Sequence, residues 1–107
     1  MASSKEYLDF VMDQLSELGD VSYRAMMGEY IIYCRGKIVG GIYDDRFLVK
    51  QTESSEKLMP NALFEIPYEG AKPMILVDNI DDSEFLCILI DRIAEEVPEP
   101  KKKKKEI

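Results

Sequence analysis

The sequence predicts a single α+β domain in which helices cover one face of an antiparallel sheet. Apolar residues recur at helical spacing in two segments, one near each end of the chain. Between these segments, runs of strand-forming residues are separated by very short turns, and such turns join antiparallel neighbours. Helices packed on one face of such a sheet form a two-layer sandwich.

The first helix is expected over residues 3–18. Ser3 and Glu6 fit a capping box, in which the hydroxyl and the carboxylate each accept a bond from an unpaired backbone N–H group. Gly19 supplies the left-handed residue on which a helix ends. The apolar stripe of this segment consists of Tyr7, Leu8, Val11, Met12, Leu15 and Leu18.

Four strands follow, and short turns make them a meander. Gly36 and the pair Asp44 and Asp45 mark the tight turns. Gly40 and Gly41 suggest a bulge in the third strand or a close approach of a helix to the sheet. The strands are expected over residues 21–27, 30–35, 37–43 and 47–50.

A short helix and two more strands come next. The helix is expected over residues 52–58, with Thr52 or Ser54 as its cap. Pro67 and Pro73 cannot donate to a β-ladder, so at least one of the two strands should lie at an edge. These strands are expected over residues 64–68 and 72–77.

The last helix is expected over residues 82–97, with Asp81 as its cap and Glu84 completing the capping box. A wide apolar stripe predicts deep packing of this helix: Phe85, Leu86, Ile88, Leu89, Ile90, Ile93, Ala94 and Val97. The predicted order is therefore α-β-β-β-β-α-β-β-α. One face of the sheet should pack against Tyr7, Leu8, Val11, Leu15, Phe85, Ile88, Leu89 and Ile93.

The composition is that of one small globular domain. The chain has 107 residues, of which 46% are hydrophobic, and this is enough for one core but not for two domains. No apolar run reaches about 18 residues, and the N-terminus lacks the order of a secretory signal, so we expect a cytoplasmic protein. Cys34 and Cys87 lie far apart in apolar stretches, which favours buried reduced thiols over a disulfide.

The charge is distributed unevenly along the chain. The net charge is −7 and residues 98–107 contribute +3, so residues 1–97 carry −10. We expect residues 1–97 to form the domain and residues 98–107 to be a disordered tail. An acidic domain repels DNA and anionic membranes, so we expect no membrane partner and no specific DNA binding by the domain. The tail could bind nucleic acid through Lys101, Lys102, Lys103, Lys104 and Lys105.

The sequence shows no catalytic apparatus. Histidine is absent, which removes the commonest general base and the commonest zinc ligand. The acidic segment 78–84 lacks the order of a calcium loop, and capping of the last helix explains it better. Asp44 and Asp45 are interpreted as a hairpin turn rather than as an acid–base pair. We therefore expect no metal, no cofactor and no enzymatic activity.

Two motifs in the middle of the chain carry a family resemblance. An R-x-M-M-G turn contains Arg24, Met26, Met27 and Gly28, and a D-D-x-F-x-V-K strand contains Asp44, Asp45, Phe47, Val49 and Lys50. In order and spacing, residues 7–97 resemble the TfoX/Sxy N-terminal domain family. The resemblance implies an α+β domain like that of secretion chaperones, without enzymatic activity. Full-length regulators of this kind carry a second domain and promote competence-gene transcription with a cyclic-AMP receptor protein. We expect this chain to stop after the first domain, so that role is not carried over.

These observations predict a protein-interaction or regulatory module with an unknown protein partner, of which a homodimer is one form. A nucleic-acid-associated transcription or competence regulator is one alternative. A small-molecule sensor is the other, and a deep pocket that holds Arg24 or Lys50 would favour it. The candidate interaction residues are Arg24, Met26, Met27, Gly28 and Lys50.

Structural roles compete with binding at these positions. Arg24 and Lys50 are expected on adjacent strands, where they either cap the sheet or pair with Glu29 or an aspartate. Met26 and its two neighbours, Met27 and Gly28, are expected to form a buried turn. The alternative for the methionines is an adaptable contact surface.

Overall fold

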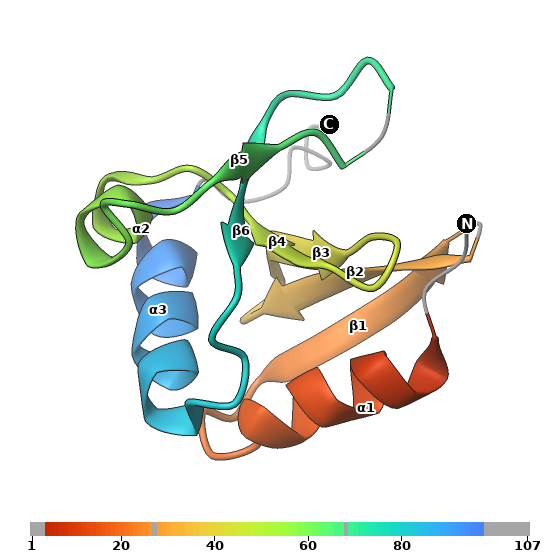
Figure 1. Ribbon diagram of the computed structural model, residues 1–107. Helices are drawn as coiled ribbons and strands as arrows, with labels where there is room; N and C mark the ends of the chain where they lie inside the picture. The colour runs from red at the N-terminus through yellow and green to blue at the C-terminus, as the bar shows by residue number, and fades with distance from the viewer. Residues whose placement is uncertain (1–3, 27, 68, 98–107) are drawn as a thin grey trace, which may run out of the picture.

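The computed structural model describes residues 4–26, 28–67 and 69–97, and its elements occur in the predicted order. They are α1 (Lys5–Gln14), β1 (Val21–Met26), β2 (Glu29–Cys34), β3 (Lys37–Ile42), β4 (Phe47–Val49), α2 (Glu53–Leu58), β5 (Phe64–Glu65), β6 (Met74–Val77) and α3 (Ser83–Glu96). All six strands form one antiparallel sheet in the order β1-β2-β3-β4-β6-β5 (Figure 1). The predicted α+β class is confirmed.

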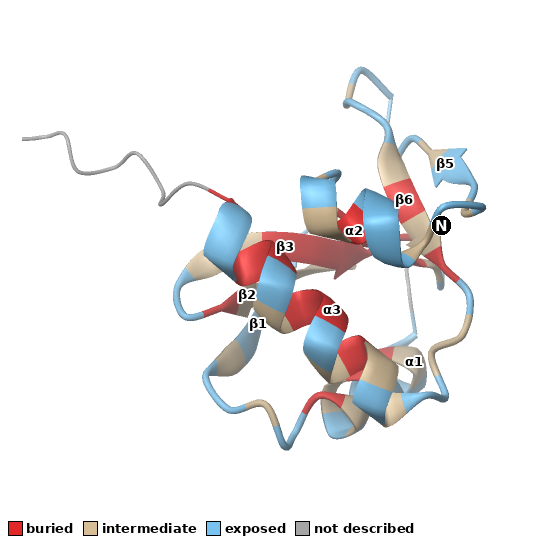
Figure 2. Cartoon of the chain, turned by 90° about the vertical axis from the view of Figure 1, so that its left-hand side faces the viewer, coloured by how far each residue is buried: buried red, intermediate tan, exposed pale blue. Residues whose placement is uncertain are grey.

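Side-chain alternation gives the sheet a helix-covered face and an open face. Ile32, Gly40, Val49 and Ile75 are paired in a row from β2 to β6, and all four are buried. Figure 2 shows α3 with its buried residues on one side and exposed residues on the other. The helices and this face share one core, which includes Leu8, Val11, Leu15, Leu89 and Ile93. The predicted two-layer sandwich, with its helices on one face, is therefore confirmed.

Two of the predicted turns are tight hairpin turns. Asp44 and Asp45 have φ angles of 54° and 57°, and Tyr43 and Arg46 exchange backbone hydrogen bonds of 2.9 and 3.0 Å across them. Positive φ at both central positions matches the right-handed twist of the flanking strands, and aspartate tolerates this conformation. Gly36, at φ 80°, lies in the turn between β2 and β3.

A β-bulge interrupts the pairing of β2 with β3. Gly40 pairs with Ile32 and Ile38 pairs with Tyr33, so Val39 is the extra residue. A Cβ atom on Gly40 would lie 2.3 Å from the carbonyl oxygen of Leu48. The predicted bulge is confirmed, and the close neighbour of Gly40 is the β4 backbone rather than a helix.

Both long helices begin at a cap other than the predicted residue. The Oγ of Ser4 accepts a hydrogen bond from the Tyr7 backbone N–H at 3.1 Å, while Ser3 lies outside the described residues. In α3, Asp82 rather than Asp81 caps the helix, because its Oδ1 accepts from the Phe85 N–H at 3.1 Å. A cap must stand directly before the first helical turn, and neighbouring serines or aspartates look alike in the sequence.

α1 is shorter than predicted. It ends at Gln14, and the chain continues to Leu18 through a tighter turn in which the Leu18 N–H donates to the Leu15 carbonyl. The expected stop at Gly19 is present, with φ 78°.

One predicted core residue is wrong. Ile88 is 47% exposed, whereas Leu86 and Ile90 are fully buried. Leu86, Leu89, Ile90 and Ile93 are spaced as one helical stripe, and Ile88 lies beside it. Tyr7 and Phe85 pack against the core while half-buried.

The last two strands and the short helix also differ in extent from the prediction. β5 contains only Phe64–Glu65 and lies at an edge of the sheet, as the proline argument predicted. β6 begins at Met74, directly after Pro73. Thr52 caps α2 in a reciprocal pair of hydrogen bonds with Ser55. Among the described residues, no helix has both the length and the apolar character that crossing a bilayer requires.

Candidate functional site

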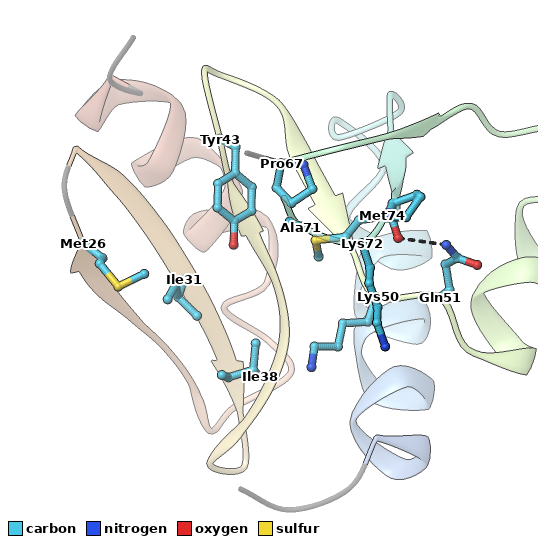
Figure 3. A pocket seen from close by; sticks show the side chains of 11 residues that line it. Met26, Ile31, Ile38, Tyr43, Lys50, Gln51, Pro67, Ala71, Lys72 and Met74 are labelled. Atoms are coloured by element: carbon cyan, nitrogen blue, oxygen red, sulfur yellow. Dashed lines mark hydrogen bonds between the residues drawn. The ribbon is translucent and has the colours of Figure 1, made fainter. Parts of the chain in front are cut away.

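The open face of the sheet carries a pocket of about 630 Å³ (Figure 3). Ile31 of β2 and Ile38 of β3 line it from the sheet, and Met26 lines it from the edge strand β1. Met74 and the loop between β5 and β6 line the other side, the loop through Pro67, Ala71, Lys72 and Pro73. This size is typical of sites for small organic ligands.

Two ammonium groups give the pocket its charge. Lys50 and Lys72 both line it, and Figure 3 shows their side chains on the side away from Met26 and Ile31. Within the described part of the chain, neither lysine side chain forms a hydrogen bond or an ion pair, and no carboxylate lines the pocket. The pocket is therefore cationic although residues 1–97 carry −10.

Gly41 makes room for an aromatic wall of this pocket. A Cβ atom on Gly41 would lie 2.7 Å from the ring and from the hydroxyl of Tyr43, and 2.8 Å from the Tyr30 carbonyl oxygen. Tyr43 is 8% exposed and lines the pocket. The Nε2 of Gln51 donates to the Pro73 carbonyl at 2.8 Å and ties the opposite wall to the end of β4.

The structure separates the predicted interaction residues into three groups. Met26 and Lys50 line the pocket. Arg24 pairs with Ile31 on the same face but does not line it. Gly28 is exposed in the turn after β1, and Met27 lies outside the described residues.

Two structural roles predicted for these residues are wrong. Met26 is 48% exposed and Gly28 is exposed too, so these two residues are not buried. Arg24 and Lys50 are not on adjacent strands, because β2 and β3 separate β1 from β4. Neither side chain pairs with Glu29 or with an aspartate among the described residues.

Other cations near the sheet have internal partners. Arg35 forms an ion pair with Asp91 at 3.1 Å, and Arg46 pairs with Glu65. Lys37 donates to the Ala94 carbonyl at the end of α3 at 3.1 Å. These side chains hold the turns against the rest of the domain. The run from Lys101 to Lys105 lies outside the described residues.

A second surface feature lies at the β5 edge of the sheet. Leu63 is 66% exposed, Phe64 52% and Ile66 53%, although all three are large and apolar. β5 pairs with β6 on one side, and no described strand pairs with its other side. We call these three residues the β5 apolar edge.

Comparison with known proteins identifies the family. A family model described as the TfoX N-terminal domain matches residues 13–84 of the 107. The chain belongs to the TfoX N-terminal domain family. It is also 32% identical over 105 residues to an uncharacterized 12.7 kDa protein from the trpE 5′ region of Spirochaeta aurantia. The aligned part makes up 97% of this chain and 91% of that protein. The resemblance inferred from the sequence motifs is confirmed.

Several carboxylates of this TfoX N-terminal domain have structural partners. Asp45 accepts from the Ser4 backbone N–H at 2.8 Å, and this bond ties the start of α1 to the β3–β4 turn. The Oε1 of Glu29 accepts from the Asp44 N–H at 3.1 Å. In the described part of the chain, no group of three or more histidine, cysteine or carboxylate side chains could hold a metal ion.

The two thiols of the TfoX N-terminal domain are free in the described residues and sit in different environments. Cys34 is fully buried in the core, and burial raises the pKa of its thiol above the ordinary value. Cys87 is only partly buried, and its Sγ donates to the Gln14 carbonyl at 3.6 Å. A raised pKa leaves little thiolate, so Cys34 is a poor nucleophile.

Sequence reasoning missed most of the pocket. The sequence patterns place Ile31 and Ile38 on strands but do not indicate which face of the sheet they occupy, and no motif points to Lys72. The alternation of β2 was a usable signal, since Ile31 and Ile32 must point to opposite faces. Nothing local indicated that Lys72 would face Lys50, because the two residues meet only through the pairing of β6 with β4.

Proposed function

We propose that this domain is a non-enzymatic interaction module that binds an extended segment of a partner protein along the β5 apolar edge. The exposure of Leu63, Phe64 and Ile66 carries the proposal. Contiguous exposed apolar residues on a soluble domain mark contact surfaces, because leaving them in water costs free energy.

The backbone at this edge favours a partner in extended conformation. Natural sheets protect exposed edges with charged side chains, because unpaired N–H and C=O groups attract other strands. Glu65 is the charged residue of β5, and Arg46 already pairs with it. A partner strand would gain backbone hydrogen bonds and apolar contacts together.

We further propose that this module acts as a regulatory adaptor in the cytoplasm. The two free cysteines support that compartment, because thiols persist where glutathione and thioredoxin keep them reduced. The absence of histidine supports a binding role over a catalytic one.

Site-specific photo-crosslinking in lysate of the source cell tests the interface. A benzoylphenylalanine at position 64 should crosslink to a discrete protein. The same residue at position 88 should not crosslink to that protein, because position 88 lies on α3 and not on the β5 apolar edge. Ile88 is a matched control, since its exposure is comparable with that of Phe64. The double variant with Leu63→Ser and Ile66→Ser should lose the interaction while its melting temperature stays near that of the wild type.

Equal crosslinking from positions 64 and 88 would contradict the proposal, and so would a complex that survives the double serine variant. Sedimentation of the purified protein shows whether the chain associates with itself. A concentration-dependent dimer that the serine variant abolishes would make the partner a second copy of this chain.

A further inference from the structure

The open-face pocket supports a function beyond partner binding: we propose that it binds a small organic anion with an apolar body and a carboxylate head. The pocket and the β5 apolar edge use different residues, and the loop between β5 and β6 connects them. The proposal therefore does not depend on the protein interface.

The apolar lining fits the body of such a ligand. Ile31 and Ile38 are half-buried on a face that none of the three described helices covers, and Met26 is 48% exposed at its border. A ligand that covers these side chains removes apolar surface from water, which drives binding. Methionines at both sides, Met26 and Met74, adapt to aliphatic or aromatic shapes because their side chains are unbranched.

Charge complementarity selects the head group. Lys50 and Lys72 bring two positive charges to one pocket. Two carboxylates on strands next to the pocket are engaged elsewhere, since Glu29 accepts from the Asp44 N–H and Glu65 pairs with Arg46. An anion placed between the lysines would gain charge-assisted hydrogen bonds, whereas a cation of the same shape would be repelled.

The walls of the pocket are fixed before any ligand arrives. The Tyr43 ring lies against the bare backbone of Gly41, and the Lys50 backbone N–H donates to the Val39 carbonyl at 3.0 Å. The hydrogen bond from Gln51 to Pro73 holds the loop that carries Lys72. Such preorganisation lowers the entropy that binding would otherwise cost.

Calorimetry and NMR titration of the full chain with four probes test the assignment. Octanoate and 2-naphthoate should each bind with a stoichiometry of one to one. The probe with the higher affinity shows whether the pocket prefers a ligand with an aliphatic or an aromatic apolar body. Octanol and octylammonium should bind at least about tenfold more weakly. Backbone shifts should concentrate at Met26, Ile31, Ile38 and Lys50.

Neutral variants of the lysines provide the decisive comparison. Lys50→Gln and Lys72→Gln should each weaken octanoate or naphthoate binding about tenfold. Lys57→Gln should leave binding unchanged, since Lys57 lies on α2 outside the pocket and pairs with Glu53. Equal affinity for octylammonium would overturn the proposal, as would shifts elsewhere, no saturable binding, or lysine variants that bind like the wild type. If a peptide bound more tightly than these probes through its C-terminal carboxylate, the ligand of the pocket would be a polypeptide rather than a small molecule, and the proposal would be wrong.

Discussion

Gly40 and Gly41 have no Cβ atom, and this lets neighbouring groups pack closely against both faces of the sheet. Gly40 lets the β4 backbone approach the bulge, and Gly41 lets the Tyr43 ring lie against β3. An alanine at Gly40 would meet backbone atoms of Leu48 and Val49, which cannot move aside as a side-chain end can. Because packing here is so close, we expect even a small increase in side-chain volume at Gly40 to be destabilising.

Leu89 and Ile88 provide a test of the core at residue scale. Leu89 is fully buried and Ile88 is 47% exposed, although they are neighbours on α3. Leu89→Ala should lower the free energy of unfolding by about 2–5 kcal/mol, because it leaves a cavity. Ile88→Ala should change it by less than about 0.5 kcal/mol. Urea denaturation of both variants measures these changes. Similar losses of unfolding free energy in the two variants would mean that α3 packs on the core through a different side than the structure shows.

The two cysteines should differ in reactivity. The Cys34 thiol is buried and its pKa is raised by burial, so an alkylating reagent should modify it only when the domain opens. Cys87 is partly exposed and should react first in the native protein. Mass spectrometry of partly labelled protein, with the Cys87→Ser variant as control, measures the order. Faster labelling of Cys34 would contradict the packing of β2.

At the scale of elements, α2 depends on its neighbours. Its six residues are too few for a stable isolated helix. The reciprocal bonds between Thr52 and Ser55 fix its start, and the Ser54 backbone N–H donates to the carboxylate of Glu96 on α3 at 3.0 Å. The Ser54 hydroxyl donates to the same carboxylate. This contact joins the connection after β4 to the last helix.

The contact between Ser54 and Glu96 should make stability depend on pH. Hydrogen bonds from Ser54 lower the pKa of Glu96 below its ordinary value of 4.5. The stabilisation is therefore present above that ordinary value and is lost as pH falls through the lower folded-state pKa. Wild type should be more stable than Glu96→Gln at neutral pH, and the difference should shrink in acid.

Urea denaturation from about pH 7 to about pH 3 measures this difference. Ser54→Ala is the partner variant. In its background, Glu96→Gln should have a smaller effect than in the wild type, because the hydroxyl donor is gone while the backbone N–H of residue 54 can still donate to Glu96. A difference between wild type and Glu96→Gln that stayed constant over the whole range would show that the contact does not form in solution.

The distribution of charge along the chain determines which part of the molecule can bind nucleic acid. Residues 1–97 carry −10, and several cations on the turns are paired with carboxylates or carbonyl groups. Any attraction to DNA must therefore come from the five lysines at 101–105. A lysine run contacts phosphates but cannot read base edges.

Duplex DNA binding by the full chain should consequently be weak and independent of sequence. Five phosphate contacts limit the slope of log affinity against log salt to about −4.5. Deletion of residues 98–107 should abolish the binding, as fluorescence anisotropy with two unrelated duplexes would show. If the shortened chain still bound DNA, or preferred one duplex, Arg24 and Lys50 would be the next residues to replace, since their side chains have no ion-pair partner among the described residues.

Much of the fold could be predicted because its determinants are local. A few adjacent residues determine the hairpin turn at Asp44 and Asp45 and the end of the first helical segment at Gly19. They also determine the hydrophobic periodicity that identifies each helix and strand. Errors occurred where adjacent residues compete for one role. Ser4 and Asp82 took the caps expected at Ser3 and Asp81, and the position of Ile88 on its helix depended on which stripe the core selected.

The sequence by itself determined the element order, the hairpins, the charge imbalance and the family. Only the tertiary structure decided that Met26, Lys50 and Lys72 line one pocket and that Leu63 and Ile66 stay exposed. Both outcomes follow from β6 lying between β4 and β5, which carries the loop of Lys72 over the open face and leaves β5 at the edge. That arrangement joins strands that are distant in the chain, and its free energy comes from the buried core as a whole rather than from any local motif.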